Sequence, residues 1–485
     1  MQNSEVVLYN LSKQASKESY PLDRLYRNLY NKDFYIKAYE NVVRGKGSNG
    51  QQIDYKQISE EKIEAMIALL KNESYQPLNR NMKVNTKKQP YQWDTEKEWQ
   101  DRLIQEICRM MLDAIYEPTF SAFSHSFREK RNCQTALVQV HQTCKGVKWF
   151  IQGEVKDFYT SMDYHILIHI LRKKIKDERF IRLMWKFLKA GYLEEWRFNL
   201  TYSNTPVGGR LSPILANIYL NELDQYVTNK VLEENREWNM SQPHSHNSKQ
   251  HKSLHYVRYG AHFLIGIQGS KKDCQQIQSM LGDYLWENLQ LEMKEARNTI
   301  VHSSKNTAFL GYEITIKPTM THNVPNHKSG EVQLRISKRT IERFILDRKM
   351  VKDIQAKQWD MLHRTKLLYL KDVEIIQLYN AELRGLYQYY CIAENVSQKM
   401  GQLKHVMEYS CLKTLANKYK STVKKIRTKY RQGKYWGVKI DTGAEEKLIL
   451  FYNEGFKKRK MNHKRNIDRK PTLKYAKVQS HHVNG

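Results

Sequence analysis

Residues Tyr256–Ile267 read YVRYGAHFLIGI and carry the clearest local signal in the chain. Aromatic and β-branched residues, which favour strands, stand on both sides of Gly260 and Ala261. Two such runs separated by a few residues that include glycine are typical of a β-hairpin. The sequence therefore predicts strands over Leu254–Tyr259 and Phe263–Ile267, joined by a short turn.

The segments before this hairpin alternate between strand and helix patterns. Lys148–Val155 (KWFIQGEV) is rich in strand-forming residues and precedes a helix that should start near Asp163. Pro206, Gly208 and Gly209 mark a turn. Apolar residues at helical spacing predict helices over Glu60–Leu70, Trp99–Ala114 and Pro213–Val227.

Helical segments dominate the chain from about Val332 onward. Three of them are predicted from the spacing of apolar residues: Lys338–Val351, Val373–Cys391 and Lys404–Lys429.

The composition indicates a globular protein with an anionic partner. The chain has 485 residues, 40% of them hydrophobic, which is ample for a sizeable core and favours two to four domains. Its formal net charge of +30 is too large to serve solubility alone. We therefore expect a long polyanion as partner, bound with salt-dependent affinity because binding releases counterions.

The sequence gives no sign of export or of a membrane. The first residues lack an apolar run of signal-peptide length, and no long apolar run follows. We expect an intracellular protein, in a bacterial cytoplasm or an organellar matrix, that does not bind membranes. None of the six cysteines forms a CxxC pair, so we expect buried free thiols and no zinc ribbon.

One basic stretch near the C-terminus is dense enough to indicate a nucleic-acid surface. No acid occurs between Lys413 and Lys434, and aromatic residues are interleaved with the cations. Cations at this density neutralise phosphates, and aromatic rings stack on unpaired bases. The expected RNA-binding residues here are Lys413, Lys418, Lys420, Lys424, Lys425, Arg427, Lys429, Tyr430, Arg431, Lys434 and Trp436.

Six segments, in order along the chain, resemble group II intron reverse transcriptases, also called maturases. They are SHSFREKRNCQTAL (Ser124–Leu137), GEVKDFYTSMD (Gly153–Asp163), TPVGGRLSPILANIYLNELD (Thr205–Asp224), YVRYGAHFLIGI (Tyr256–Ile267), LQLEMKEARNTIVH (Leu289–His302) and FLGYEI (Phe309–Ile314). Leu378–Val396 and Tyr409–Trp436 resemble the thumb, or domain X, of the same family. The resemblance covers roughly Leu25 to Phe456.

The resemblance implies an α+β fold, with right-hand fingers and palm followed by an α-helical thumb. It assigns the N-terminal extension and fingers to 1–120, the fingers and palm to 121–325, the thumb to 326–440 and a basic tail to 441–485. No cysteine follows Cys411, so we expect no endonuclease domain. Arg128, Lys130 and Arg131, in the first resembling segment, are added to the expected RNA-binding residues.

The chain departs from the family pattern at the metal ligands. Polymerases of this family hold two Mg²⁺ ions with one aspartate on a palm strand and two in a Tyr-Ala-Asp-Asp hairpin. The hairpin here reads Tyr259-Gly260-Ala261-His262, so both aspartates are absent. The palm-strand aspartate aligns with Glu154, whose carboxylate is displaced by one methylene. We read the nearby Asp157 and Asp163 as a loop acid and a helix cap.

Other departures affect nucleotide binding. The family glutamine before Gly-Gly is Val207, and the segment that normally contacts the triphosphate reads KQPYQW over Lys88–Trp93, without its arginine. A family glycine is replaced by Ser126, and a family lysine by Arg297. Residues typical of the fold persist, among them Phe127, Arg128, Ser212, Pro213, Asn217, Phe263 and Gly311.

These departures predict a protein that binds structured RNA, group II intron RNA above all, and assists its splicing without polymerase activity. The chemistry would belong to the RNA, and we expect no catalytic residue, metal or cofactor in the protein. Two alternatives remain open at this point. One is a weak or altered polymerase that uses Glu154 and unrecognised acids. The other is an RNA-binding scaffold of a different ribonucleoprotein.

Overall fold

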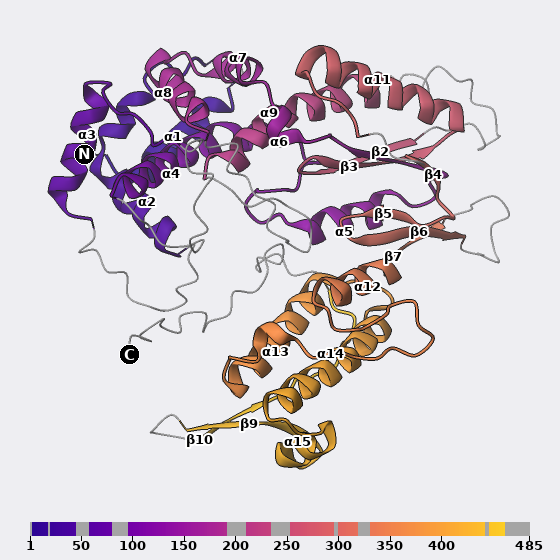
Figure 1. Cartoon of the computed structure of the whole chain (residues 1–485). Helices are drawn as coiled ribbons and strands as arrows, with labels where there is room; N and C mark the ends of the chain where they lie inside the picture. The colour runs from indigo at the N-terminus through magenta and orange to yellow at the C-terminus, as the bar shows by residue number, and fades with distance from the viewer. Residues whose placement is uncertain are drawn as a thin grey trace. The chain divides into compact units, whose positions relative to one another are not determined.

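The computed structural model describes residues 2–17, 20–44, 58–79, 96–191, 210–233, 253–294, 299–318, 330–441 and 446–460. Helices and sheets both occur, as an α+β protein requires (Figure 1). The chain divides into two compact units. The first contains described residues up to Arg131 and from Val147 to Val301; the second contains Asn132–Gly146 and described residues from His302 onward.

Helices make up most of the first unit. They are α1 (Ser4–Ala15), η1 (Tyr26–Tyr30), α2 (Lys32–Arg44), α3 (Glu60–Lys71), α4 (Glu96–Tyr116), η3 (Glu117–Thr119), α6 (Phe158–Ser161), α7 (Tyr164–Lys174), α8 (Glu178–Lys189), α9 (Ser212–Tyr226), η4 (Val227–Val231) and α11 (Lys271–Leu289). The helices predicted over Glu60–Leu70, Trp99–Ala114 and Pro213–Val227 are confirmed as α3, α4 and α9.

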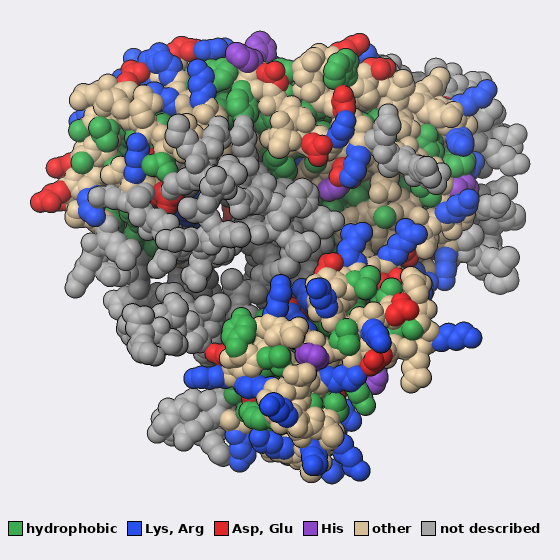
Figure 2. All heavy atoms as spheres, viewed as in Figure 1, with side chains coloured by type: hydrophobic (Ala, Val, Ile, Leu, Met, Phe, Trp, Pro, Cys, Tyr) green, Lys and Arg blue, Asp and Glu red, His purple; other side chains and the backbone are tan. Residues whose placement is uncertain are grey.

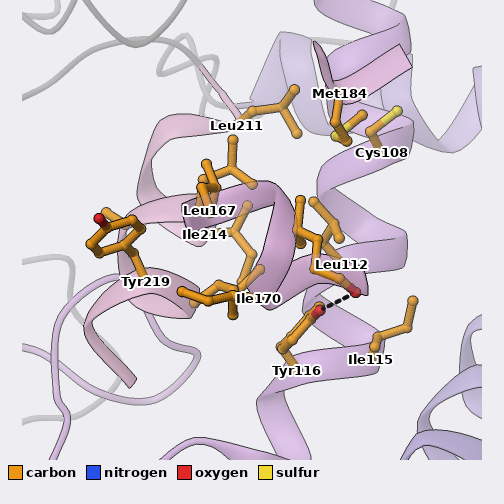
Figure 3. Packing of buried hydrophobic residues seen from close by; sticks show 14 of the residues in the cluster. Cys108, Leu112, Ile115, Tyr116, Leu167, Ile170, Met184, Leu211, Ile214 and Tyr219 are labelled. Carbon is orange, nitrogen blue, oxygen red and sulfur yellow. Dashed lines mark hydrogen bonds between the residues drawn. The ribbon is translucent and has the colours of Figure 1, made fainter. Parts of the chain in front are cut away.

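The core of this unit lies where α4 meets α7, α8 and α9. Leu112 and Tyr116 of α4 are buried against Leu167 and Ile170 of α7 and Ile214 of α9 (Figure 3). The predicted start of α7 is confirmed, because the Asp163 side chain accepts hydrogen bonds from the backbone amides of His165 and Ile166.

A four-stranded sheet stands beside these helices, with the strand order β2-β3-β1-β4. Its strands are β1 (Trp149–Glu154), β2 (Ser253–Tyr259), β3 (His262–Gln268) and β4 (Ile300–His302). Helix α11 runs along one face of the sheet (Figure 1).

The predicted hairpin is confirmed as β2 and β3, which pair antiparallel from Tyr259 opposite His262 to Ser253 opposite Gln268. Strand β3 also pairs with β1, and this register sets Gly153 opposite Phe263. A Cβ at Gly153 would lie about 2.0 Å from the Phe263 ring, so only glycine allows the ring to lie across β1.

The second unit combines two small sheets with long helices. Its elements are α5 (Cys133–Thr143), β5 (Thr307–Phe309), β6 (Tyr312–Pro318), β7 (Gly330–Ile336), α12 (Lys338–Asp347), η5 (Thr365–Leu367), α13 (Asp372–Tyr390), α14 (Val396–Lys418), α15 (Val423–Lys429), β8 (Arg431–Gln432), β9 (Tyr435–Asp441) and β10 (Glu446–Leu450). Strands β5, β6 and β7 form one sheet, and β8, β9 and β10 another.

The single helix predicted over Lys404–Lys429 is wrong. Helix α14 starts earlier, at Val396, and ends at Lys418, and α15 follows after a turn. Lys420 in this turn has a positive φ of 45°, and Thr422 caps α15 by accepting a hydrogen bond from the Lys425 amide. A residue in the left-handed conformation ends a helix, and threonine favours the N-cap position.

Two other predicted helices are found with altered ends. The helix over Val373–Cys391 is α13, and that over Lys338–Val351 is α12, which stops at Asp347. The C-terminal region is also less helical than expected, since β8, β9 and β10 follow α15. The turn at Pro206, Gly208 and Gly209 lies outside the described residues.

The six cysteines are free and buried, as predicted. No helix in the described part of the chain is long and apolar enough to cross a membrane.

Candidate functional site

A buried ion pair connects strand β2 of the β2–β3 hairpin to helix α9. Arg258 on β2 and Asp224 on α9 are almost fully buried, with their closest atoms 2.6 Å apart. The hydroxyl of Tyr256 donates a further hydrogen bond of 2.8 Å to the Asp224 carboxylate. Burial lowers the pKa of Arg258, but Asp224, Tyr256 and Tyr159 together outweigh it, so the pKa is raised. Arg258 therefore stays charged and fixes β2 on α9.

The hairpin turn is held by a neighbouring loop. Gly260 has a positive φ of 60°, which glycine adopts without strain. Its amide donates a 2.8 Å hydrogen bond to the Ser126 hydroxyl, and its carbonyl accepts one of 3.1 Å from Arg258. The Ser126 hydroxyl in turn lies 3.3 Å from Oδ1 of Asn217. Ser126, a departure from the family pattern, thus positions the turn.

The structure brings together three of the four positions at which the sequence departs from the family's metal ligands or from its glutamine before Gly-Gly. Glu154 ends β1 directly opposite His262, and the Ala261 carbonyl accepts a 2.9 Å hydrogen bond from the Val155 amide. The fourth position, Val207, lies outside the described residues, as do Lys88–Trp93 and Arg297.

Glu154 has a cationic neighbour that sequence reasoning missed. Lys294 Nζ lies 3.1 Å from Glu154 Oε1, and the Lys294 amide donates a 2.8 Å hydrogen bond to the Glu154 carbonyl. His262 Nδ1 is 3.9 Å from the other carboxylate oxygen. Lys294 lies in a segment that resembles the family, but the contact becomes visible only when that segment is placed beside β1.

The charges around Glu154 do not suit a pair of Mg²⁺ ions. Burial lowers the pKa of His262; Glu154 opposes this and Lys294 adds to it, and the pKa lies below its usual value. Next to His262, Glu154 and Lys294 contribute one carboxylate and one amine, whose formal charges cancel. Mg²⁺ requires several oxygen ligands. Within the described residues, no three His, Cys, Asp or Glu side chains lie close enough together to hold a metal.

The two other acids of this region have the positions expected from the sequence. Asp163 is the N-cap of α7. Asp157 lies in the loop after β1, has a positive φ of 42° and makes no side-chain cap bond to α6.

Arg128 was expected to contact RNA, but the structure gives it an internal role. Its side chain is only 6% exposed and forms a two-pronged contact with Glu117 at 2.8–3.1 Å. It also donates to the carbonyls of Ser121 and Ser124. A guanidinium occupied in this way holds the loop together and has little left to offer a phosphate. We therefore remove Arg128 from the expected RNA surface.

The neighbouring cations differ from each other. Arg131 donates to the carbonyls of Ala122 and Ser124, and burial followed by the charge of Arg128 lowers its pKa. Lys130 is exposed, with a positive φ of 59°. Only Lys130 in this loop points its charge to solvent without a contact to a carboxylate or carbonyl of the described chain.

The basic stretch contains no acid in sequence, yet acids from elsewhere reach part of it. Lys413 pairs with Asp360 at 2.8 Å, and Arg427 pairs with Glu408 at 3.2 Å. Lys418 pairs with Asp372 at 2.8 Å. All three cations have a carboxylate partner, but only Lys418 and Asp372 are both mostly buried, so Lys418 is the least available of the three to RNA.

Tyr430 and Trp436 were expected to bind RNA, but the structure buries both side chains. Tyr430 is 9% exposed and its hydroxyl donates to Asp372; burial and this bond raise its pKa. Trp436 is 6% exposed, stacks on Phe451 with ring centres 5.0 Å apart, and donates to Glu408 at 3.0 Å. Both rings pack inside the second unit, where Asp372 of α13 binds Tyr430 and Glu408 of α14 binds Trp436.

The remaining cations form an exposed surface around α15. We define the α15 surface by exposed residues of the turn before α15, of α15 itself and of the segment after it: Tyr419, Lys420, Lys424, Lys425, Lys429, Arg431, Lys434 and Tyr435. No carboxylate lies within ion-pair distance of Lys420, Lys424 or Lys425 in the residues that the structure describes.

Aromatic rings lie among these cations. Lys429 lies 4.3 Å from the centre of the Tyr419 ring, and Lys434 lies 5.2 Å from that of Tyr435. Figure 2 shows Lys and Arg side chains gathered over this part of the second unit, with few acids among them. Unpaired cations beside exposed rings can contact phosphates and bases together.

The chain is similar to known proteins along most of its length. A family profile described as "Reverse transcriptase (RNA-dependent DNA polymerase)" matches residues 87–314, and one described as "Type II intron maturase" matches residues 342–482. The chain is 35% identical to the group II intron-encoded protein LtrA of Lactococcus lactis, over 94% of this chain and 85% of that protein.

Two more distant relatives come from eukaryotes. A COX1/OXI3 intron 2 protein of Saccharomyces cerevisiae is 30% identical over 68% of this chain and 44% of its own length. A nuclear intron maturase of Arabidopsis thaliana, described as mitochondrial, is 24% identical over 66% of this chain and 56% of its own length.

Proposed function

Because the chain belongs to the family of group II intron-encoded reverse transcriptases and maturases, we propose that it binds folded group II intron RNA and assists its splicing without synthesising DNA. The observation that carries this proposal is a contrast between two sites. The α15 surface has exposed rings and cations without a carboxylate partner. The Glu154 carboxylate, in contrast, is paired with Lys294 at the position where a polymerase of this family binds its metal ions.

The proposed division of labour follows the family architecture. We assign the first unit mainly to fingers and palm, and the helices from α12 to α15 to the thumb. Binding would come from phosphate and 2′-hydroxyl contacts at the α15 surface and Lys130, together with stacking on Tyr419 and Tyr435. Such contacts stabilise a folded RNA by mass action, because they favour the state that presents the right arrangement of backbones. The RNA then performs the splicing chemistry with its own metal ions.

The test is recovery and sequencing of the RNA that crosslinks to the protein in its source cell. We expect one enriched RNA with the domains of a group II intron. The purified protein should raise the splicing rate of that RNA at low Mg²⁺ concentration. Enrichment of an unrelated structured RNA would favour the scaffold of another ribonucleoprotein instead, and no enrichment above a mock purification would refute RNA binding.

The site around Glu154 should be dispensable for RNA binding and for assistance of splicing. Glu154 is paired with Lys294 at the surface, and exposed pairs of this kind contribute about 0–1 kcal/mol. We therefore expect Glu154→Ala to leave crosslinking and the splicing rate within about twofold of the unchanged protein. A loss of splicing in a variant that still folds would give this site an active role and contradict the proposal.

A further inference from the structure

An open pocket lies between α11 and the end of β1, beside Glu154. Its volume is about 720 Å³, within the usual range for small-ligand sites. Gly282 and Trp286 line it from α11, and Leu291 and Met293 line it from the segment after that helix. The Trp286 side chain is 55% exposed, so this pocket offers a large aromatic ring to solvent.

The polar rim of the pocket does not suit a phosphate. It contains three carboxylates, of Glu154, Asp157 and Glu292, against two amines, of Lys156 and Lys294. The formal sum is one negative charge, in a chain whose net charge is +30. A rim of this sign gives a phosphate no attraction, and the part of a ligand that it fits is a neutral ring with donors and acceptors on its edge, while a phosphate attached to that ring stays in solvent.

One carboxylate of the rim lacks a partner. Within the described chain no hydrogen bond or ion pair engages the Asp157 side chain, which is exposed in the loop after β1. The Lys156 amine is 2.8 Å from Glu292, and both side chains of that pair are 54% exposed. Exposed pairs hold weakly, so the amine can turn toward a ligand.

From these observations we propose that the pocket binds a single guanine base, with its ring against Trp286. Guanine presents N–H donors on one edge, which suit the Asp157 carboxylate, and the O6 and N7 acceptors on another, which suit a lysine amine. Adenine has no O6 acceptor and no N2 amine, and pyrimidines offer a smaller ring to the tryptophan. Stacking of a base on an aromatic side chain is a recurrent mode of single-stranded RNA recognition.

This inference rests on the proposed function, because the guanine belongs to an unpaired guanosine of the bound RNA. The pocket uses no residue of the α15 surface, so the two claims can fail separately. Loss of RNA binding when the α15 cations are removed tests the proposed function. Binding of a free guanine nucleotide tests the pocket, and it does so without any intron RNA.

The test uses the full chain labelled with 5-fluorotryptophan and followed by fluorine NMR. Comparison with Trp286→Phe identifies the Trp286 resonance, and the remaining tryptophans serve as internal controls. Titration with guanosine 5′-monophosphate should shift this resonance in a saturable way, with a dissociation constant on the order of 1 mM for one stacked base. Ribose 5-phosphate, which carries the same phosphate without a base, should leave it unchanged.

A second variant tests the contact with the carboxylate. Asp157→Asn should weaken binding of the guanine nucleotide on the order of tenfold, since a charged acceptor is lost while the contact with the Trp286 ring remains. Adenosine 5′-monophosphate should bind the unchanged protein more weakly than the guanine nucleotide. The assignment is overturned if the Trp286 resonance does not shift, if ribose 5-phosphate shifts it equally, or if the adenine nucleotide binds as well as the guanine nucleotide.

Discussion

Replacing Asp224 with alanine should destabilise the first unit by about 3–5 kcal/mol, because it leaves the buried Arg258 guanidinium without its carboxylate. Domains of this kind have a total stability of roughly 5–15 kcal/mol, so the loss is a large share of it. The Tyr256 hydroxyl and Ser124 would also lose part of the network that Arg258 and Asp224 complete. Urea unfolding followed by tryptophan fluorescence measures the shift in midpoint.

The matched control is Glu222→Ala, on the same helix. Glu222 pairs with Lys173 at 2.6 Å, but both side chains are partly exposed, so its removal should cost no more than about 1 kcal/mol. A double variant, Asp224→Leu with Arg258→Met, removes both buried charges and should recover part of the lost stability. Equal midpoints for Asp224→Ala and Glu222→Ala would show that the buried pair does not support the hairpin.

Changing Lys420, Lys424 and Lys425 together to alanine should weaken RNA binding on the order of 100-fold near 0.1 M salt, because three unpaired cations of the α15 surface are lost. Each lost phosphate contact should also reduce the slope of log affinity against log salt by about one unit. Filter binding over a range of salt concentrations gives both quantities.

A control of equal charge separates this surface from the total charge of the protein. Lys32, Lys173 and Lys338 each pair with a carboxylate on an exposed surface. Changing these three to alanine removes the same formal charge, yet it should change affinity much less and leave the slope nearly unaltered. Similar losses in the two triple variants would mean that net charge, and not the α15 surface, determines binding.

The hairpin and most helices could be predicted because their signals are local. Strand-forming residues flank Gly260, and Asp163 precedes an apolar run at helical spacing. The break between α14 and α15 was missed because helical periodicity continues across it. The signal that could have revealed it is the run Ser421–Thr422, since these residue types favour helix N-caps.

Burial of the site residues could not be predicted, because it depends on partners far away in the sequence. Tyr430 is bound by Asp372, 58 positions earlier, and Trp436 by Glu408, 28 positions earlier. A stretch without acids in sequence therefore acquires acids from α13 and α14 in space. The same holds for Glu154, whose partner Lys294 is 140 positions away.

These contacts sort the basic stretch into two groups that its composition does not distinguish. Lys418 stabilises the second unit through the mostly buried Asp372, whereas Lys413 and Arg427 form partly exposed pairs that contribute about 0–1 kcal/mol each. The cations of the α15 surface remain for RNA. Substitution of Lys418 should therefore lower stability before it lowers affinity, and substitutions in the α15 surface should do the reverse.

The most direct measurement offers the protein a labelled DNA primer annealed to an RNA template, with all four deoxynucleotides and Mg²⁺ or Mn²⁺, and examines one reaction on native and denaturing gels. Ala261 and His262 supply no carboxylate, and the Glu154 carboxylate is paired with Lys294. The α15 surface can still bind the phosphates of the duplex. We expect a band shifted by the bound protein on the native gel and a primer of unchanged length on the denaturing gel. A primer extended beyond the level of a reaction without protein would contradict the proposed loss of polymerase activity.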